Sequence, residues 1–246
     1  MFGVGFMNKG AIIIPARYES SRFPGKPLAE IHGKTMIQRV YERCVEAVGD
    51  KAVYVATDDI RIEQNVNSFG GQFVRTSTNC LTGTDRLAEA NEKLSLDYVV
   101  NVQGDEPLIN PKDISKVFLE MKSDRSSVIN CYCEISDYER DMHSVPKVVI
   151  SNSRKLLYMS RGGIPFDKLG NPNPMFKQVC IYGYSREHLK IFANSKFKQP
   201  NENFEDIEIL RFLELDINVK MLKVDSGSIA VDTLIDLDRA RALFMK

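Results

Sequence analysis

The sequence carries no excess charge of either sign and no long apolar segment. Lysine plus arginine and aspartate plus glutamate each number 33 in 246 residues, so the formal net charge is zero. A general nucleic-acid-binding protein would show a basic excess, and this balance argues against that class. No apolar run approaches the roughly 18 residues that a membrane span needs. We therefore expect a soluble protein that binds neither nucleic acid nor a membrane.

Cysteines paired in the manner of disulfide or zinc sites are also lacking. There are five, an odd number, and no C-x-x-C pair occurs among Cys44, Cys80, Cys131, Cys133 and Cys180. Reduced thiols fit this usage better than a disulfide framework does. The short apolar N-terminus has neither a basic stretch nor a small-residue cleavage site, which argues against a signal peptide. These features predict a cytoplasmic protein.

The first half of the sequence alternates short apolar runs with segments of helical periodicity. Residues 10–15 form a continuous apolar run, as a buried parallel strand does, and residues 35–48 carry an apolar stripe at helical spacing. The alternation continues with predicted strands at 52–56, 72–74 and 97–102 and predicted helices at 58–69, 84–94 and 111–121. This order favours a parallel sheet covered by helices on both faces.

The second half is less regular and shows neither an internal repeat nor a low-complexity tract. It predicts strands at 127–135, 147–150, 156–159, 179–184 and 219–224 and helices at 186–192, 204–215 and 233–244. We therefore expect some antiparallel strands in this part of the sheet.

A loop rich in arginine, serine, glycine and proline follows the first predicted strand. It spans residues 16–27 and contains Arg17, Arg22 and Lys26. Ligands of an open parallel sheet bind beyond the carboxyl ends of its strands, which is where this loop lies. Its cations would neutralise phosphate charge, and Gly25 would let backbone N–H groups approach an anion. The alternative is a solvated basic loop. The loop is not a P-loop, because G-x-x-x-x-G-K-[ST] is absent.

One aspartate stands where a metal could bind. Asp105 follows the predicted buried strand 97–102, with Gly104 beside it to allow close approach, and a carboxylate in that place suits a magnesium–triphosphate group. The alternative for Asp105 is a turn or cap residue. Asp232 precedes the last predicted helix, where its position by itself favours a helix cap, with Asp236 completing a capping-box arrangement.

Residues 82–86, Thr-Gly-Thr-Asp-Arg, stand at the start of a predicted helix. Backbone N–H groups there, together with Arg86, suit an anionic or carbonyl-bearing ligand. An N-cap by Thr82 or Thr84 is compatible with that reading.

Taken together, these motifs resemble one family. The segment PARYESSRFPGKPL at 15–28 is similar to the N-terminal signature of the CMP-Kdo synthetase family of sugar-acid cytidylyltransferases. Further similar segments follow in the same order: ATDD at 56–59, TGTDR at 82–86, NVQGDEPLI at 101–109, LYMSR at 157–161, IPFD at 164–167, IYGY at 181–184 and VDTLIDL at 231–237. Seven or eight matches in order, along nearly the whole chain, are far more specific than any one of them.

The resemblance implies a fold and an organisation. The fold would be α/β, a Rossmann-like nucleotide-diphospho-sugar transferase fold with a mixed, mostly parallel sheet and helices on both faces. Residues 1–246 would form a single domain, with its nucleotide-binding part at about 10–125. The sugar-binding and dimerisation part would lie at about 126–232, in a homodimer.

The resemblance also implies an activity: transfer of CMP from CTP to an acidic eight- or nine-carbon sugar, with Mg²⁺ as cofactor. Asp105 and Asp232 would hold the metal, and Lys26, Arg22 and Asp105 would be catalytic. The implied nucleotide contacts are Ala16, Arg17, Ser21, Arg22, Lys26, Thr82, Gly83, Thr84, Arg86 and Gln103. The implied sugar contacts are Gln103, Arg161, Gln178, Tyr182, Glu208 and Arg211.

The sequence departs from the family pattern on the sugar side. Gln178 stands where these enzymes usually have a histidine, and Arg211 and Phe212 replace a usual Glu-Gln pair. Replacing an acceptor by a cation, and an amide by an apolar ring, changes which polar groups a buried pocket can satisfy. The nucleotide half of the signature is intact. We therefore predict CTP with Kdo as the best single acceptor, and keep open an amino-Kdo analogue, a sialic-type nonulosonic acid or a catalytically silent nucleotide-binding subunit.

Overall fold

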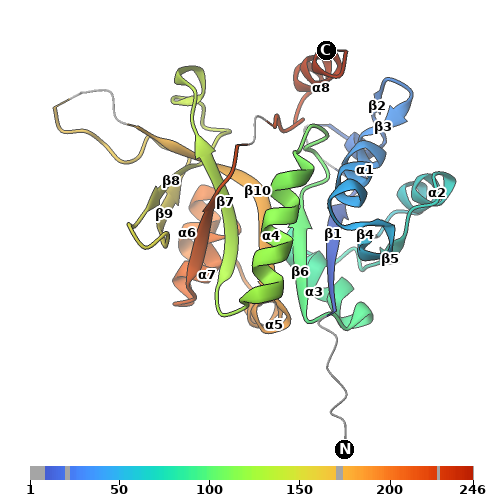
Figure 1. The fold of residues 1–246 in the computed structure, drawn as a ribbon, viewed down its shortest axis with the longest axis horizontal. Helices are drawn as coiled ribbons and strands as arrows, with labels where there is room; N and C mark the ends of the chain where they lie inside the picture. Colours follow the sequence, from blue (N-terminus) through green and yellow to red (C-terminus); the bar gives the residue numbers. More distant parts are fainter. Residues whose placement is uncertain (1–8, 20–22, 170–173, 226–227, 246) are drawn as a thin grey trace, which may run out of the picture.

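The structure, a computed structural model, describes residues 9–19, 23–169, 174–225 and 228–245, and a mixed nine-stranded sheet runs through them (Figure 1). Seven strands lie side by side in the order β11–β7–β10–β6–β1–β4–β5. Four of them are mutually parallel: β1 (Gly10–Ala16), β4 (Val53–Thr57), β5 (Phe73–Arg75) and β6 (Tyr98–Val102). The predicted parallel first half of the sheet is confirmed.

The second half of the chain adds the expected antiparallel strands. β10 (Phe176–Ser185) is antiparallel to both β6 and β7 (Val128–Glu134), and β11 (Val219–Lys223) is parallel to β7. β8 (Lys147–Ile150) and β9 (Leu156–Ser160) extend the sheet as a hairpin from the start of β10. β10 is longer than predicted, because residues 176–179 pair with β7 and β8 before a bulge shifts the register between Val179 and Tyr182.

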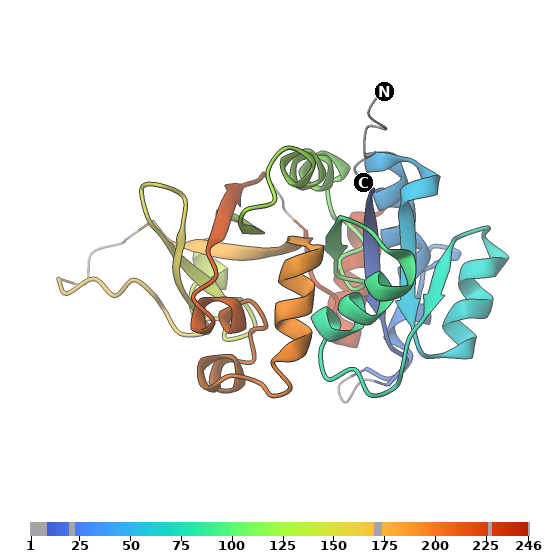
Figure 2. The same cartoon turned by 90° about the horizontal axis from the view of Figure 1, so that it is seen from below.

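Helices cover both faces of the sheet, as Figure 2 shows end on. α1 (Met36–Val48) and α4 (Pro111–Ser123) lie on one face, and α3 (Gly83–Leu94) and α5 (Arg186–Asn194) lie on the other. The remaining helices are α2 (Ile60–Ser68), α6 (Pro200–Glu205), α7 (Leu210–Glu214) and α8 (Leu234–Leu243). Among the described residues, none of the helices combines the length and apolarity that crossing a lipid bilayer requires.

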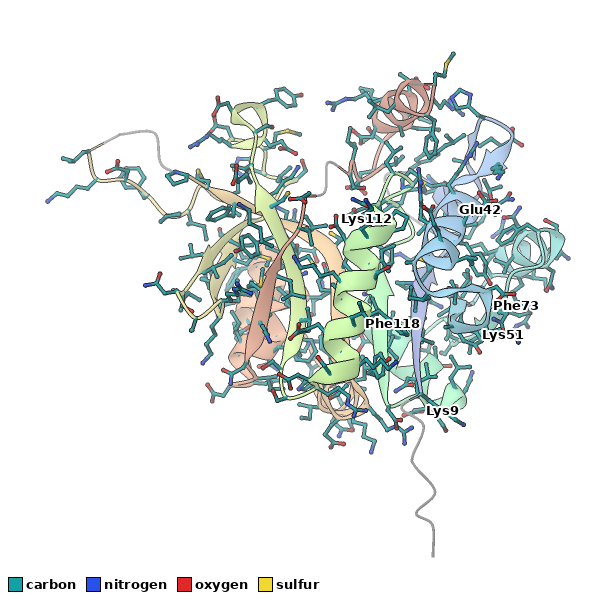
Figure 3. All side chains as sticks on the ribbon, in the orientation of Figure 1. Lys9, Glu42, Lys51, Phe73, Lys112 and Phe118 are labelled. Atoms are coloured by element: carbon teal, nitrogen blue, oxygen red, sulfur yellow. The ribbon has the colours of Figure 1, made fainter. Side chains whose placement is uncertain are left out.

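The apolar core is divided by the sheet. Ile12 and Ile14 of β1 point to the α1 and α4 side, and Ile13 points to the α3 and α5 side, which is the alternation expected of a strand buried on both faces. Side chains fill the space between the layers (Figure 3), where Phe118 of α4 packs against Tyr98 of β6 with ring centroids 5.3 Å apart. Full burial of an aliphatic side chain such as those of Ile12, Ile13 and Ile14 contributes roughly 1.5–3 kcal/mol to the free energy of unfolding.

Local capping residues set the helix starts near the predicted positions. The Thr35 side chain accepts a hydrogen bond from the Gln38 N–H at the start of α1, and the Asp59 side chain accepts one from the Arg61 N–H at the start of α2. Each cap satisfies a backbone donor that has no partner within the helix.

The predicted helix at 204–215 is wrong, because this segment forms the end of α6 and all of α7 with a turn between them. α6 begins earlier, at Pro200, and ends at Glu205; the next residue, Asp206, has a left-handed φ of 50° and ψ of 50°. A residue in that conformation cannot continue a right-handed helix. The turn places Asp206 and Glu208 where a continuous helix would not.

Candidate active site

A cavity of about 310 Å³ opens at the carboxyl ends of β1 and β6. In Figure 1 this is the upper edge of the sheet, opposite the end at which the chain enters β1. Its lining combines the ends of these strands with the turns before α1, before α3, before α8 and around α6: Pro15, Ala16, Arg17, Lys26, Pro27, Cys80, Leu81, Thr82, Gly83, Arg86, Gln103, Gly104, Asp105, Lys198, Asp206, Glu208 and Asp232. The sequence prediction of a ligand site beyond the first strand therefore falls at a real cavity.

Lys26 joins the two predicted metal ligands in this cavity. Its Nζ donates hydrogen bonds to Asp105 Oδ2 at 2.7 Å and to Asp232 Oδ1 at 3.1 Å. Burial alone would lower the pKa of Lys26, but the two carboxylates outweigh burial and hold that pKa above its ordinary value. The ammonium therefore remains charged and is the counter-ion of both aspartates.

Backbone contacts fix the three side chains from different elements. Lys26 begins the short 3-10 helix η1 (Lys26–Leu28), and it follows Gly25, whose φ of 72° favours glycine. A Cβ at Gly104 would lie 3.2 Å from the Pro15 carbonyl oxygen, so a glycine there lets the loop after β6 pack tightly on β1. The Val231 N–H donates to the Asp105 carbonyl oxygen at 2.8 Å, which brings the next residue beside Asp105.

Asp232 does not cap the last helix. Thr233 is the N-cap of α8 and forms a capping box with Asp236. The cap that the sequence suggested for Asp232 is therefore provided by the next residue, Thr233. The Asp232 carboxylate is directed instead to Lys26.

The paired carboxylates fit a magnesium ion. Mg²⁺ is bound in nucleotide sites through one or two carboxylates, with water and substrate phosphates completing its oxygen ligands. Asp105 and Asp232 have oxygens within hydrogen-bonding distance of one ammonium, so a single cation can contact both. Within the described ranges no group of three or more histidine, cysteine or acidic side chains is arranged to hold a metal ion.

The N-terminus of α3 is occupied by a carboxylate from this same chain. Glu208 accepts hydrogen bonds from the Gly83 N–H at 3.1 Å, the Thr84 N–H at 2.9 Å and the Thr84 hydroxyl at 2.5 Å. Thr82 caps the helix, as expected. The donors predicted to meet an anionic ligand thus meet Glu208, the type of group that a helix N-terminus favours.

Arg86 lies in the cavity lining but is buried and already paired. It donates to the Thr76 hydroxyl at 2.5 Å and to the Asp58 carboxylate at 3.1 Å. These contacts tie the first turn of α3 to the residues that follow β4 and β5. The geometry therefore gives Arg86 a role in shaping the cavity wall.

Four predicted sugar contacts lie outside the lining of this cavity. On β10, the Gln178 side-chain amide donates to the Tyr182 hydroxyl at 3.1 Å, and Tyr182 is buried. Arg161 directs its guanidinium to the backbone carbonyls of Glu205, His143 and Asp206. Arg211 is 1% exposed and pairs with Glu202, so the geometry does not support its contact with a sugar. Gln103 and Glu208 do line the cavity, while Ser21 and Arg22 lie outside the described residues.

Sequence reasoning missed several lining residues, chiefly Lys198 and Asp206. The Lys198 ammonium donates to Asp206 Oδ1 at 2.7 Å, and Asp206 is the left-handed residue that ends α6. Cys80 was also missed as a lining residue. Burial and its hydrogen bond to Glu89 raise the pKa of the Cys80 thiol to about 11, so it is not a nucleophile at neutral pH. No motif in the sequence marks these three residues.

Comparison with known proteins decides the family. The family model described as cytidylyltransferase matches residues 11–222. The chain belongs to the cytidylyltransferase family. This confirms the resemblance read from the motifs and identifies the protein as a nucleotidyltransferase.

Individual relatives cover almost the whole cytidylyltransferase chain. It is 41% identical to the 3-deoxy-manno-octulosonate cytidylyltransferase of Escherichia coli over 238 residues, 96% of each chain. It is 44% identical over 217 residues to the 8-amino-3,8-dideoxy-manno-octulosonate cytidylyltransferase of Shewanella pealeana, covering 85% of this chain and 88% of that protein. A solved structure of CMP:2-keto-3-deoxy-manno-octonic acid synthetase complexed with CTP superposes with a TM-score of 0.90 at 40% identity, covering 96% and 98% of the two chains. The predicted fold class is confirmed.

Proposed function

We propose that the cytidylyltransferase transfers CMP from CTP to Kdo, a 2-keto-3-deoxy sugar acid, and releases pyrophosphate in the cytoplasm. The observation that carries the proposal is the group of Lys26, Asp105 and Asp232 at the cavity formed by β1 and β6. The similarity to a 3-deoxy-manno-octulosonate cytidylyltransferase over 96% of both chains supports the acceptor. The similarity to a structure complexed with CTP supports the nucleotide. The five free thiols fit a reducing compartment.

In this proposal the triphosphate lies between the basic loop and the aspartates. Arg17 and Lys26 offset its charge from the cavity wall, and Ser21 and Arg22 are assigned to the same loop. Ala16, Thr82, Gly83 and Gln103 contact the nucleotide, whereas Thr84 and Arg86 hold the shape of the wall through their own hydrogen bonds. Lining by Ala16, Arg17, Lys26, Thr82, Gly83 and Gln103 supports these roles.

The chemistry is an in-line displacement at phosphorus. The anomeric hydroxyl oxygen of the sugar acid bonds to the α-phosphorus, the bond from that phosphorus to the β-phosphate oxygen breaks, and the hydroxyl proton passes to solvent. Asp105 and Asp232 would hold Mg²⁺, which when bound supplies charge neutralisation and activation of the hydroxyl. The Lys26 ammonium, which pairs with both aspartates in the free protein, would turn to the negative charge of the triphosphate once a metal binds the two carboxylates. No covalent intermediate with the protein is needed.

The acceptor lies beyond the α-phosphate, toward Gln103 and Glu208. Both line the cavity, and their amide and carboxylate suit sugar hydroxyls. Gln178, Tyr182 and Arg161 remain predictions for the same substrate. An 8-amino-Kdo acceptor is the second candidate: the relative from S. pealeana carries that name, and the acidic side chains of Asp206 and Glu208 suit a nearby ammonium.

A panel of acceptors tests the function. With CTP and Mg²⁺, we expect pyrophosphate release with Kdo at a kcat/KM at least about tenfold above that with 8-amino-Kdo or a nonulosonic acid. The Asp105→Asn variant is the matched control for contaminating activity. Turnover of another acid with inertness toward Kdo would reassign the acceptor. CTP binding without turnover of any acid would indicate a catalytically silent subunit.

A homodimer is the proposed assembly. Large apolar side chains are exposed on β9, on the loop after it and on α6, namely Leu157, Tyr158, Phe166, Leu169 and Phe204. β9 and α6 are in contact, since the Ser160 hydroxyl donates to the Glu205 carboxylate at 2.6 Å. Monomeric proteins rarely expose apolar surface in such a group, which supports its burial against a second copy.

Light scattering tests the assembly. We expect a solution mass of twice the 27.9 kDa chain, and we expect Phe204→Glu to shift the population to monomer because a charge would be buried in the interface. Leu119→Glu, at an exposed site on α4, is the control and should leave the mass unchanged. A monomeric wild-type protein would contradict the proposal.

A further inference from the structure

One wall of the cavity comes from the connection between α5 and α7. Lys198, Asp206 and Glu208 line the cavity from this connection, which we call the 198–208 wall. α6, within the wall, has only six residues, and the turn after it is left-handed at Asp206. Such a short, irregular segment does not hold its shape alone, since isolated helices of this length are unstable. Contacts from outside the segment must therefore position the wall.

Arg211 provides the most buried of these contacts. Its Nε and Nη2 each donate to the Glu202 carboxylate at 2.6 Å, and the two side chains are 1% and 0% exposed. The guanidinium also lies over the Phe192 ring, 3.7 Å from its centroid, and Nη1 donates to the Phe192 and Ser195 carbonyls. Arg211 thus joins α7 to α6 and to the end of α5 at one point. A bidentate pair of this kind fixes direction as well as distance.

The same part of the chain is anchored to α3. The Glu208 carboxylate accepts from the N-terminus of α3, and Asp85 in the first turn of that helix lies 3.7 Å from Arg211 Nη1. The wall therefore has two charged anchors, one at Glu208 and one at Arg211. The residues proposed to bind the triphosphate and the metal, Lys26, Asp105 and Asp232, do not depend on these anchors. Their positions are set by local backbone contacts at Gly25, Gly104 and Val231.

We infer that Arg211 is a positioning residue for the acceptor, acting through Glu202 to present Asp206 and Glu208 to the cavity. This inference rests on the proposed function. Arg211 cannot reach a ligand itself, because its guanidinium is enclosed by Glu202, Phe192 and Ser195. Replacing a buried ion pair by apolar residues commonly preserves the stability of a protein. We therefore assign the Arg211–Glu202 pair to the positioning of the 198–208 wall and not to the stability of the fold. Displacement of a substrate-positioning group by about 1 Å can lower a rate by roughly a hundredfold.

The expected signature is a selective loss of acceptor binding. In the double variant Glu202→Leu/Arg211→Met both buried charges are removed, so the protein should remain folded while the wall loses its fixed direction. We expect its KM for the sugar acid to rise at least about tenfold and its KM for CTP to change less than about twofold. Arg211→Lys should fall between wild type and the double variant, since lysine keeps the charge but not the bidentate geometry.

A control variant distinguishes a general loss of protein stability from a displacement of the 198–208 wall. Val117→Ala removes buried volume from α4, on the opposite face of the sheet, and should lower the melting temperature without raising the acceptor KM. A double variant with a wild-type acceptor KM, or one whose CTP KM rises equally, would overturn the inference. A wild-type protein inert toward every sugar acid would instead refute the proposed function, so the two failures are distinguishable.

Discussion

Replacing Asp105 by asparagine is expected to lower kcat by about a thousandfold while the protein stays folded. The amide has the shape of the carboxylate but not its charge, and Mg²⁺ requires anionic oxygen ligands to compete with water. Asp105 is one of only two carboxylates that contact Lys26 among the described residues, so the remaining Asp232 would hold the cation alone. A metal in such sites contributes several kcal/mol to the transition state, and each 1.4 kcal/mol corresponds to about a tenfold change in rate.

Pyrophosphate release at saturating CTP and sugar acid measures the effect, and calorimetry measures CTP binding in the same variant. Asp137→Asn is the matched control, because the Asp137 side chain is 99% exposed on a turn away from the cavity. A kcat for Asp105→Asn within a few fold of the wild type would show that Asp105 does not hold the metal.

Removing the charge of Lys26 is expected to have two opposite effects. Lys26→Met should lower kcat/KM by about a hundredfold or more, since one preorganised cation facing the triphosphate is lost. The same change should strengthen binding of a divalent cation to the protein without CTP. In the free protein the ammonium lies 2.7 and 3.1 Å from the two carboxylates, so it competes with a metal for them.

Titration with Mn²⁺, followed by electron paramagnetic resonance, separates the two effects. The Lys26→Met variant should bind Mn²⁺ at least about tenfold more tightly than the wild type. The ammonium of Lys26 repels a cation bound at the same carboxylates, and at such short range in a partly buried site this repulsion costs more than about 1.4 kcal/mol. Lys198→Met is the control, since Lys198 lines the same cavity but pairs with Asp206. Unchanged or weaker Mn²⁺ binding by Lys26→Met would show that the ammonium does not compete for the aspartates.

Much of the fold could be predicted because its signals are local. Thr35 and Asp59 cap their helices from within the same turn, and the apolar run of β1 is readable without knowledge of its neighbours. The helix predicted at 204–215 failed because its break depends on the conformation of one residue, Asp206, that is not marked by glycine or proline. What stops α6 is the tertiary setting of that residue.

In the candidate site, too, some positions could be predicted from the sequence and others depend on tertiary contacts. Lys26 and Asp105 follow neighbouring strands, so the rule for parallel sheets predicts their proximity although they are 79 residues apart. Asp232 follows the edge strand β11, three positions from β6 in the sheet, and only the family resemblance indicated its place. The partner of Arg211 could not be predicted, because Glu202 meets it only after the chain reverses between α6 and α7. A charge pair that forms across an irregular turn leaves no periodic trace in the sequence.

The last helix belongs to a small core of its own. Val231, Leu237 and Ala240 pack with Ile31 and Met36, apart from the two main cores. Small packing units open at a lower free energy than the whole protein. Opening of this unit would carry Asp232 away from Lys26 while the sheet stayed intact. We therefore expect thermal inactivation of the enzyme to begin with the opening of α8 and its small core, before the nine-stranded sheet unfolds.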